Sequence, residues 1–141
     1  MEIRPLTDHY AVSPQITPED VEVIRDAGFT TILCNRPDGE VPQPLQAQAV
    51  GAAAKAAGLE FKVLPVTHQT ITPELVAEQR AIVEGSVGPV MAYCASGTRC
   101  TIVWALGQAG LQPADKIIGA AAKAGYDIAG LRPQLDALAN G

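Results

Sequence analysis

The residues best suited to covalent chemistry in this chain are a cysteine and an arginine that follow an apolar run. Val90 to Tyr93 is apolar, Cys94 comes directly after it, and Arg99 stands five positions further on. Backbone N–H groups in the compact stretch between them can point at one centre, and Arg99 adds a planar fork of donors. The residues of this stretch are Ala95, Ser96, Gly97 and Thr98. The pattern predicts an anion-binding loop around a cysteine.

The reactivity of Cys94 depends on its ionisation. A free cysteine has a pKa of about 8.5 and is mostly a thiol at neutral pH, whereas the thiolate is the nucleophile. A helix that begins near Arg99 would place its positive end on the sulfur and stabilise the thiolate. The alternative interpretation is a buried cysteine at a strand end beside a surface arginine. The residue types from Cys94 to Arg99 all stand where an anion cradle needs them, which favours the reactive site.

Strand and helix patterns alternate along the chain. Thr-Pro pairs at positions 17 and 72 are typical of helix starts. Strands are expected at 10–13, 29–34, 60–66 and 88–93, and helices at about 17–27, 45–57, 72–84 and 101–109, with shorter ones near 113–124 and 133–139. This alternation predicts one α/β domain, residues 1–141, with a parallel sheet flanked by helices.

In such sheets ligands bind at the carboxyl ends of the strands, so the loops after the second, third and fourth expected strands should meet at one crevice. Arg36 and Asp38 lie in the first of these loops, and His68 lies in the second. All three are candidates for substrate binding, and His68 or Asp38 could donate a proton to a leaving group. Arg36 and Asp38 could equally pair with each other, and His68 could be a solvated loop residue.

Composition narrows the class of protein. Of the 141 residues, 48% are hydrophobic and only 4% are aromatic, so small aliphatic side chains must fill the core. The net charge of −5 argues against nucleic acid and anionic membrane surfaces as partners. The N-terminal residues lack a signal-peptide pattern, and no apolar run is long enough to span a membrane, so we expect a cytoplasmic protein. We expect no metal or organic cofactor.

Two further cysteines could have a redox role. Cys34 ends an expected strand and could form a reversible disulfide with Cys94 that protects it from overoxidation. It could also be a small buried apolar residue. A bond from Cys100 to Cys94 would need close Cα atoms and a reshaped loop. An odd number of cysteines argues against a disulfide framework.

The segments Asn35–Glu40 and Cys94–Arg99, with the helix starts at Thr17 and Thr72, resemble the phosphatase-like domain family of the beta-lactamase hydrolase-like proteins. The resemblance covers nearly the whole chain. It implies a fold like that of dual-specificity tyrosine phosphatases and a loop often interpreted as a rhodanese-type sulfurtransferase site. Some members are fused to persulfide-oxidising enzymes or work beside them, which makes such an enzyme a candidate partner.

The resemblance also implies roles for individual residues. Cys94 would be the nucleophile and Arg99 would bind the oxyanion, while Ser96, Gly97 and Thr98 would shape the cradle. The family usually has arginine at the position of Ala95 and serine at the position of Cys100. The missing arginine weakens the positive field, and the thiol of Cys100 makes redox chemistry possible there.

The loop spacing bears on whether sulfur or phosphorus is transferred. Tyrosine phosphatases usually have five residues between cysteine and arginine, whereas four lie between Cys94 and Arg99, as in many rhodaneses. Phosphatases of this fold also need an acid for the leaving group, and residues 65–70 contain no aspartate. Sulfur transfer has a good leaving group and depends less on an acid. These two points favour a sulfurtransferase.

Three functions follow from these patterns. In the favoured one, the Cys94 thiolate takes sulfane sulfur from a small-molecule donor, holds it as a persulfide, and passes it to a thiol acceptor. In the alternative, Cys94 attacks a phosphorylated substrate and forms a phosphocysteine, as in tyrosine phosphatases. The third is a noncatalytic thiol or anion sensor, which the presence of both Cys94 and Arg99 makes the weakest of the three.

Overall fold

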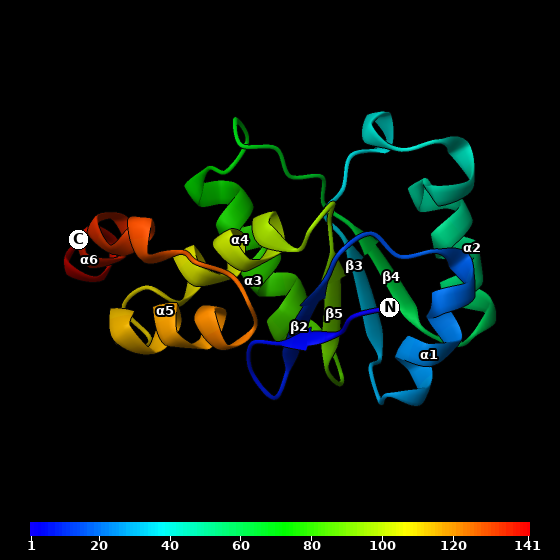
Figure 1. The fold of residues 1–141 in the computed structure, drawn as a ribbon, viewed down its shortest axis with the longest axis horizontal. Coiled ribbons are helices and arrows are strands. Elements are labelled where there is room, and N and C mark those ends of the chain that lie inside the picture. The colour runs from blue at the N-terminus through cyan, green and yellow to red at the C-terminus, as the bar shows by residue number, and fades with distance from the viewer.

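A computed structural model describes residues 1–141, and its centre is a five-stranded sheet. Across the sheet the strands follow the order β1-β2-β5-β3-β4 (Figure 1). Their bounds are β1 Arg4–Pro5, β2 Tyr10–Ser13, β3 Thr31–Cys34, β4 Glu60–Val63 and β5 Val90–Tyr93. The α/β class is confirmed. The sheet is mixed and not wholly parallel, because the short strand β1, which the sequence did not indicate, pairs antiparallel with β2.

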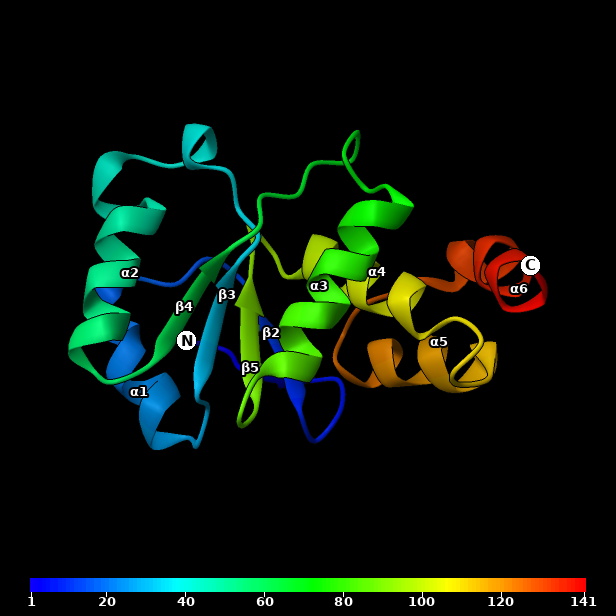
Figure 2. The same cartoon turned by 180° about the vertical axis from the view of Figure 1, so that it is seen from behind.

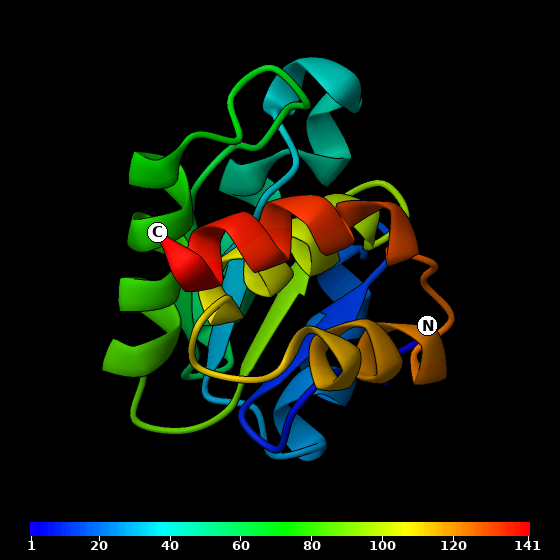
Figure 3. The ribbon, with the colours of Figure 1, turned by 90° about the vertical axis from the view of Figure 1, so that its left-hand side faces the viewer.

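The helices cover both faces of the sheet. They are α1 Val21–Asp26, α2 Ala47–Ala56, α3 Pro73–Gly85, α4 Thr98–Gln108, α5 Ala114–Lys123 and α6 Arg132–Asn140. Helices α1 and α2 pack on one face, and α3 to α5 pack on the other with α6 outside α4 (Figures 1 and 2). Seen from the side, α5 and α6 form an outer layer over α4 (Figure 3). No helix combines the length and the apolar character needed to cross a membrane.

The parallel strands bring the loops of interest to one edge of the sheet. Strands β2, β3 and β5 are buried along their whole length, whereas the edge strand β4 is largely exposed. Strand β5 lies between β2 and β3, parallel to both. The chain therefore leaves β2, β3, β4 and β5 at the same edge, as expected for ligand-binding loops of such sheets.

Two helix starts form as the sequence indicates, and one is displaced. The Thr17 N–H donates to Asp20 Oδ2 at 2.9 Å, and Thr72 Oγ1 accepts from the Leu75 N–H at 3.2 Å. Helix α4 begins at Thr98, three residues before the expected range 101–109 and next to Arg99, where a helix start would stabilise the thiolate. The left-handed turn at Gly97 (φ +93°) reverses the chain there, so that the first turn of the helix already belongs to the cysteine loop.

The β5 residue next to the cysteine carries an unpartnered hydroxyl. Tyr93 is fully buried on the α1/α2 face, and its Oη has no hydrogen-bond partner. A buried polar group without a partner is destabilising by about 1–3 kcal/mol relative to a satisfied one.

We therefore expect Tyr93→Phe to leave the free energy of unfolding unchanged or to raise it by about 1 kcal/mol, because the lost hydroxyl makes no bond. Urea denaturation followed by circular dichroism measures this difference. A loss of more than about 1 kcal/mol would show that the hydroxyl is bonded after all.

Candidate active site

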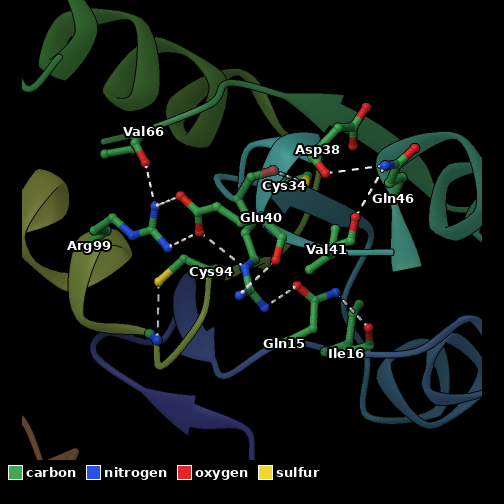
Figure 4. Close-up of polar contacts among 12 residues, drawn as sticks. Gln15, Ile16, Cys34, Asp38, Glu40, Val41, Gln46, Val66, Cys94 and Arg99 are labelled. Carbon is green, nitrogen blue, oxygen red and sulfur yellow. Dashed lines mark hydrogen bonds and ion pairs between the residues drawn. The ribbon is translucent and has the colours of Figure 1, made fainter. Parts of the chain in front are cut away.

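The sulfur of Cys94 lies inside a loop of hydrogen-bond donors. The Gly97 N–H donates to Cys94 Sγ at 3.1 Å (Figure 4). The Cys100 thiol, with backbone N–H groups of Cys100, Gly97 and Arg99, lowers the pKa of Cys94 to about 5, although burial opposes the shift. Cys94 is therefore a thiolate at neutral pH. The expected helix-start effect is present, because the N–H groups of Arg99 and Cys100 belong to the first turn of α4 and Gly97 is its N-cap.

Tyr126 holds this loop from outside. Its hydroxyl donates to the Ser96 carbonyl at 2.7 Å, and the guanidinium of Arg4 lies 5.1 Å from its ring centroid. A Cβ atom at Gly97 would lie 2.1 Å from Tyr126 Oη. Glycine is thus required at position 97 both by its positive φ and by the space that Tyr126 occupies.

Arg99 is fixed by a carboxylate from another loop. Its Nη1 and Nη2 donate to the two oxygens of Glu40 at 2.8 and 2.7 Å, and Nη1 also donates to the Val66 carbonyl at 2.8 Å. Arg36 contacts the same carboxylate through Nε at 3.2 Å, and its Nη1 donates to Gln15 Oε1 at 3.2 Å (Figure 4). The Arg99 guanidinium, and to a lesser extent that of Arg36, holds the pKa of Glu40 below its usual value.

These contacts leave one edge of the Arg99 guanidinium free. An arginine has five N–H donors, and Glu40 and Val66 accept three of those of Arg99. The remaining two, on Nε and Nη2, lie side by side along one edge of the planar group. They form the fork that is suited to two oxygens of a tetrahedral anion.

A cleft of about 460 Å³ opens above the loop. Its lining residues are Glu40, Thr67, His68, Gln69, Ala95, Ser96, Thr98 and Arg99. The structure thus brings His68, from the loop after β4, opposite the cysteine loop, as the sequence indicates. Cys94 itself is fully buried and does not line the cleft. A substrate must therefore enter the ring of N–H groups to reach the sulfur.

Asp38 and Arg36 do not pair with each other. Asp38 Oδ1 accepts from the Ala47 N–H at 2.8 Å, at the start of α2, and Asp38 does not line the cleft. Arg36 contacts Glu40 instead, and it reaches the site only through that residue. The sequence hypothesis that Asp38 donates a proton has no support in this geometry.

The structure does not bring Cys34 beside Cys94. In the register of β3 and β5, Cys34 pairs with Tyr93, and neighbouring residues of a strand point to opposite faces. Cys34 packs with Tyr93 on the α1/α2 face, whereas Cys94 and Cys100 pack on the α4 face. All three cysteines are free. Burial raises the pKa of both Cys34 and Cys100, so Cys100 remains a thiol that can donate to Cys94.

Sequence reasoning missed the contacts that Glu40 and Tyr126 make with the cysteine loop. Glu40 is the last residue of the segment Asn35–Glu40, and its acidic side chain beside Arg36 and Asp38 was the available signal. No local pattern connects either residue with Arg99 or Gly97, because both contacts join distant parts of the chain.

Comparison with known proteins identifies the family of this chain. The family model of the "Beta-lactamase hydrolase-like protein, phosphatase-like domain" matches residues 2–111. A beta-lactamase hydrolase-like protein of Xylella fastidiosa is 32% identical over 131 residues, which are 91% of this chain. The match spans only 30% of that relative's length.

Solved structures share the fold. A candidate phosphatase from Neisseria meningitidis is 36% identical, with a TM-score of 0.87 over 98% of this chain and 99% of the other. PTPMT1 superposes with a TM-score of 0.75 over 99% of this chain and 94% of the other, at 12% identity, and so shows likeness of fold alone. The neighbours are cysteine phosphatase-like folds.

The thiolate should be visible in a pH titration. We expect the ultraviolet absorbance of the Cys94 thiolate, taken as the difference from Cys94→Ser, to rise with a midpoint of about 5 and to disappear as the pH falls below it. Cys100→Ala should move the midpoint upward by about one unit, because it removes a donor to the thiolate.

Cys34→Ala is the matched control for this titration, since Cys34 lies on the other face of the sheet. It should leave the midpoint unchanged. A midpoint for the unmutated protein in the ordinary thiol range would contradict the donor arrangement described above.

Proposed function

The chain belongs to the phosphatase-like domain family of the beta-lactamase hydrolase-like proteins, and we propose that it is a cysteine-dependent phosphatase. The observation that carries the proposal is the buried Cys94 thiolate, ringed by N–H donors, with the free edge of Arg99 next to it. The fold of its neighbours, which are cysteine phosphatase-like, supports the same conclusion. Phosphatase chemistry therefore comes before sulfur transfer, which the loop spacing alone favoured.

The reaction would proceed in two displacements. The Cys94 thiolate attacks phosphorus and forms an S–P bond, while the P–O bond to the leaving group breaks. The free N–H groups of Arg99 and the backbone N–H groups of the loop bind the phosphoryl oxygens, where charge must be stabilised. Water then attacks the phosphocysteine, releases phosphate and restores the thiolate. Because Cys94 is fully buried, the phosphoryl group must enter the ring of N–H groups to reach the sulfur.

The proton for the leaving group would come from His68. Glu40 is held ionised by Arg99 and Arg36, so it has no proton to give, and Asp38 is bonded at the start of α2. His68 lines the same cleft as Arg99 and is exposed on the loop after β4. An imidazolium there could protonate the departing oxygen.

Sulfur transfer is the second candidate, because no free carboxylic acid lines the cleft and only four residues separate Cys94 from Arg99. The thiolate would attack the outer sulfur of a sulfane donor, expel the donor's thiolate or sulfite, and hold the sulfur as a persulfide. A thiol acceptor would then remove it. The partners of such a sulfurtransferase would be the sulfane donor, the thiol acceptor and a persulfide-oxidising enzyme that works beside the domain.

One experiment separates the two reactions. We expect the unmutated protein to hydrolyse an activated arylphosphate and to show a phosphocysteine adduct of about 80 Da after acid quenching. Cys94→Ser should abolish both signals. In a parallel sample exposed to thiosulfate, a persulfide adduct of about 32 Da without any arylphosphate turnover would give first place to sulfur transfer.

The role of His68 has its own signature. We expect His68→Ala to reduce hydrolysis of an alkyl phosphate by about a hundredfold or more, and that of an activated arylphosphate far less, because only the poor leaving group needs a proton. Steady-state rates on both substrates measure the ratio.

His9→Ala is the control for His68→Ala. The ring of His9 contacts the Val83 carbonyl away from the cleft, and its removal should change both rates equally or not at all. Equal losses on both substrates in His68→Ala would remove His68 from the proton-donor role.

A further inference from the structure

Three buried side chains from separate elements form a hydrogen-bond network beneath the cleft. Asn35 follows β3, Gln79 lies in α3 and Tyr10 lies in β2, and each is at most 2% exposed. Asn35 Nδ2 donates to Gln79 Oε1, and Gln79 Nε2 donates back to Asn35 Oδ1, both at 2.8 Å. The two amides therefore form a reciprocal pair in the protein interior.

The network ends on two backbone carbonyls. Asn35 Nδ2 also donates to the Leu64 carbonyl at 2.8 Å. At the other end, Gln79 Nε2 donates to Tyr10 Oη at 3.1 Å, and Tyr10 Oη donates to the Cys100 carbonyl at 2.9 Å. Because carbonyls can only accept, they set the direction of every bond between them. All four amide N–H groups are used, and each side chain has one orientation.

Each end of the network belongs to a segment that shapes the cleft. Asn35 begins the loop that carries Glu40, and Leu64 begins the loop that carries His68. Cys100 lies in the first turn of α4, whose N–H groups surround the Cys94 sulfur. Gln79 is the one buried residue of α3, a helix whose other side chains are partly or fully exposed. Its burial therefore serves this contact more than the apolar core.

We propose that Gln79 is a positioning residue of the active site. Through Asn35 and Tyr10 it fixes the relative positions of three segments: the loop after β3, the loop after β4 and the first turn of α4. The proposal deepens the proposed function, because it rests on Cys94 and Arg99 as the reacting pair. Through Tyr10, Gln79 holds the carbonyl of Cys100, the residue whose backbone N–H and thiol stabilise the Cys94 thiolate. Through Asn35, it holds the loop whose Glu40 orients Arg99.

A merely structural network would behave differently. Breaking a buried polar network destabilises a protein because it leaves donors and acceptors unsatisfied. That loss alone does not change the acidity of a thiol in the folded state. A raised midpoint of the Cys94 titration, with a fall in kcat that exceeds the change in KM, therefore indicates a positioning role. A loss of stability without these changes indicates a structural role only.

The test uses Gln79→Met, Tyr10→Phe and the double variant. We expect each single change to raise the midpoint of the Cys94 thiolate titration by about one unit. For arylphosphate hydrolysis near that midpoint, kcat should fall by about fivefold with a smaller change in KM, because the thiolate fraction falls from about one half to about one tenth. The double variant should be no worse than the single ones, because both changes break the same chain of bonds.

Two matched controls accompany these variants. Glu78→Met makes a similar replacement at the exposed neighbouring position of α3, and Tyr93→Phe removes a buried hydroxyl that makes no bond. Both should leave the midpoint and kcat unchanged.

The outcomes are distinguishable from failure of the proposed function. The titration needs no substrate, so it tests Gln79 even if the protein hydrolyses no phosphate ester. An unchanged midpoint in folded Gln79→Met would overturn the proposal. If Gln79→Met does not fold, the midpoint of Tyr10→Phe provides the test, because this change removes only the bonds of the Tyr10 hydroxyl, to Gln79 and to the Cys100 carbonyl, and leaves the pair of Asn35 and Gln79 intact. An unchanged midpoint in Tyr10→Phe would then overturn the proposal.

Discussion

The stabilisation of one buried sulfur anion is the constraint on which the rest of this structure depends. A thiolate without exposed surface is unfavourable unless donors replace the lost water. Here the donors are the Gly97 N–H at 3.1 Å, the first-turn N–H groups of α4 and the Cys100 thiol. This requirement accounts for the left-handed glycine, for the early start of α4, and for the Tyr126 hydroxyl that holds the loop closed.

The charges around the sulfur are nearly balanced before any substrate binds. Arg99 and Arg36 are positive, and Glu40 and the Cys94 thiolate are negative. Position 95 is an alanine, and Arg36 adds no free guanidinium to the loop, because it is engaged with Glu40. Recognition of an anion at this site therefore depends on directed N–H groups more than on net charge. The Glu40 carboxylate reduces the positive field of Arg99. The same contact fixes the orientation of the guanidinium, so that its two free N–H groups have fixed positions.

Local patterns in the sequence predicted the elements well and the contacts between them poorly. Strand β2 has the expected bounds, and the Thr17 and Thr72 helix starts form. The antiparallel β1 was missed, because Arg4–Pro5 has no strand pattern and gains its place only by pairing with β2. Asp38 was expected at the cleft and instead bonds at the start of α2, a choice that depends on how the loop turns after β3.

The sequence alone determined the reactive loop, because Cys94, the small residues and Arg99 are adjacent in the chain and the backbone of so short a segment has few conformations that bring its N–H groups together. Tertiary structure decided what surrounds it. Glu40, Tyr126 and Gln79 reach the loop from other elements, and no spacing in the sequence encodes the strand order that places them there. The pairing of Cys34 with Tyr93 likewise sends two cysteines to opposite faces, because side chains alternate along a strand and a single residue of register decides the face.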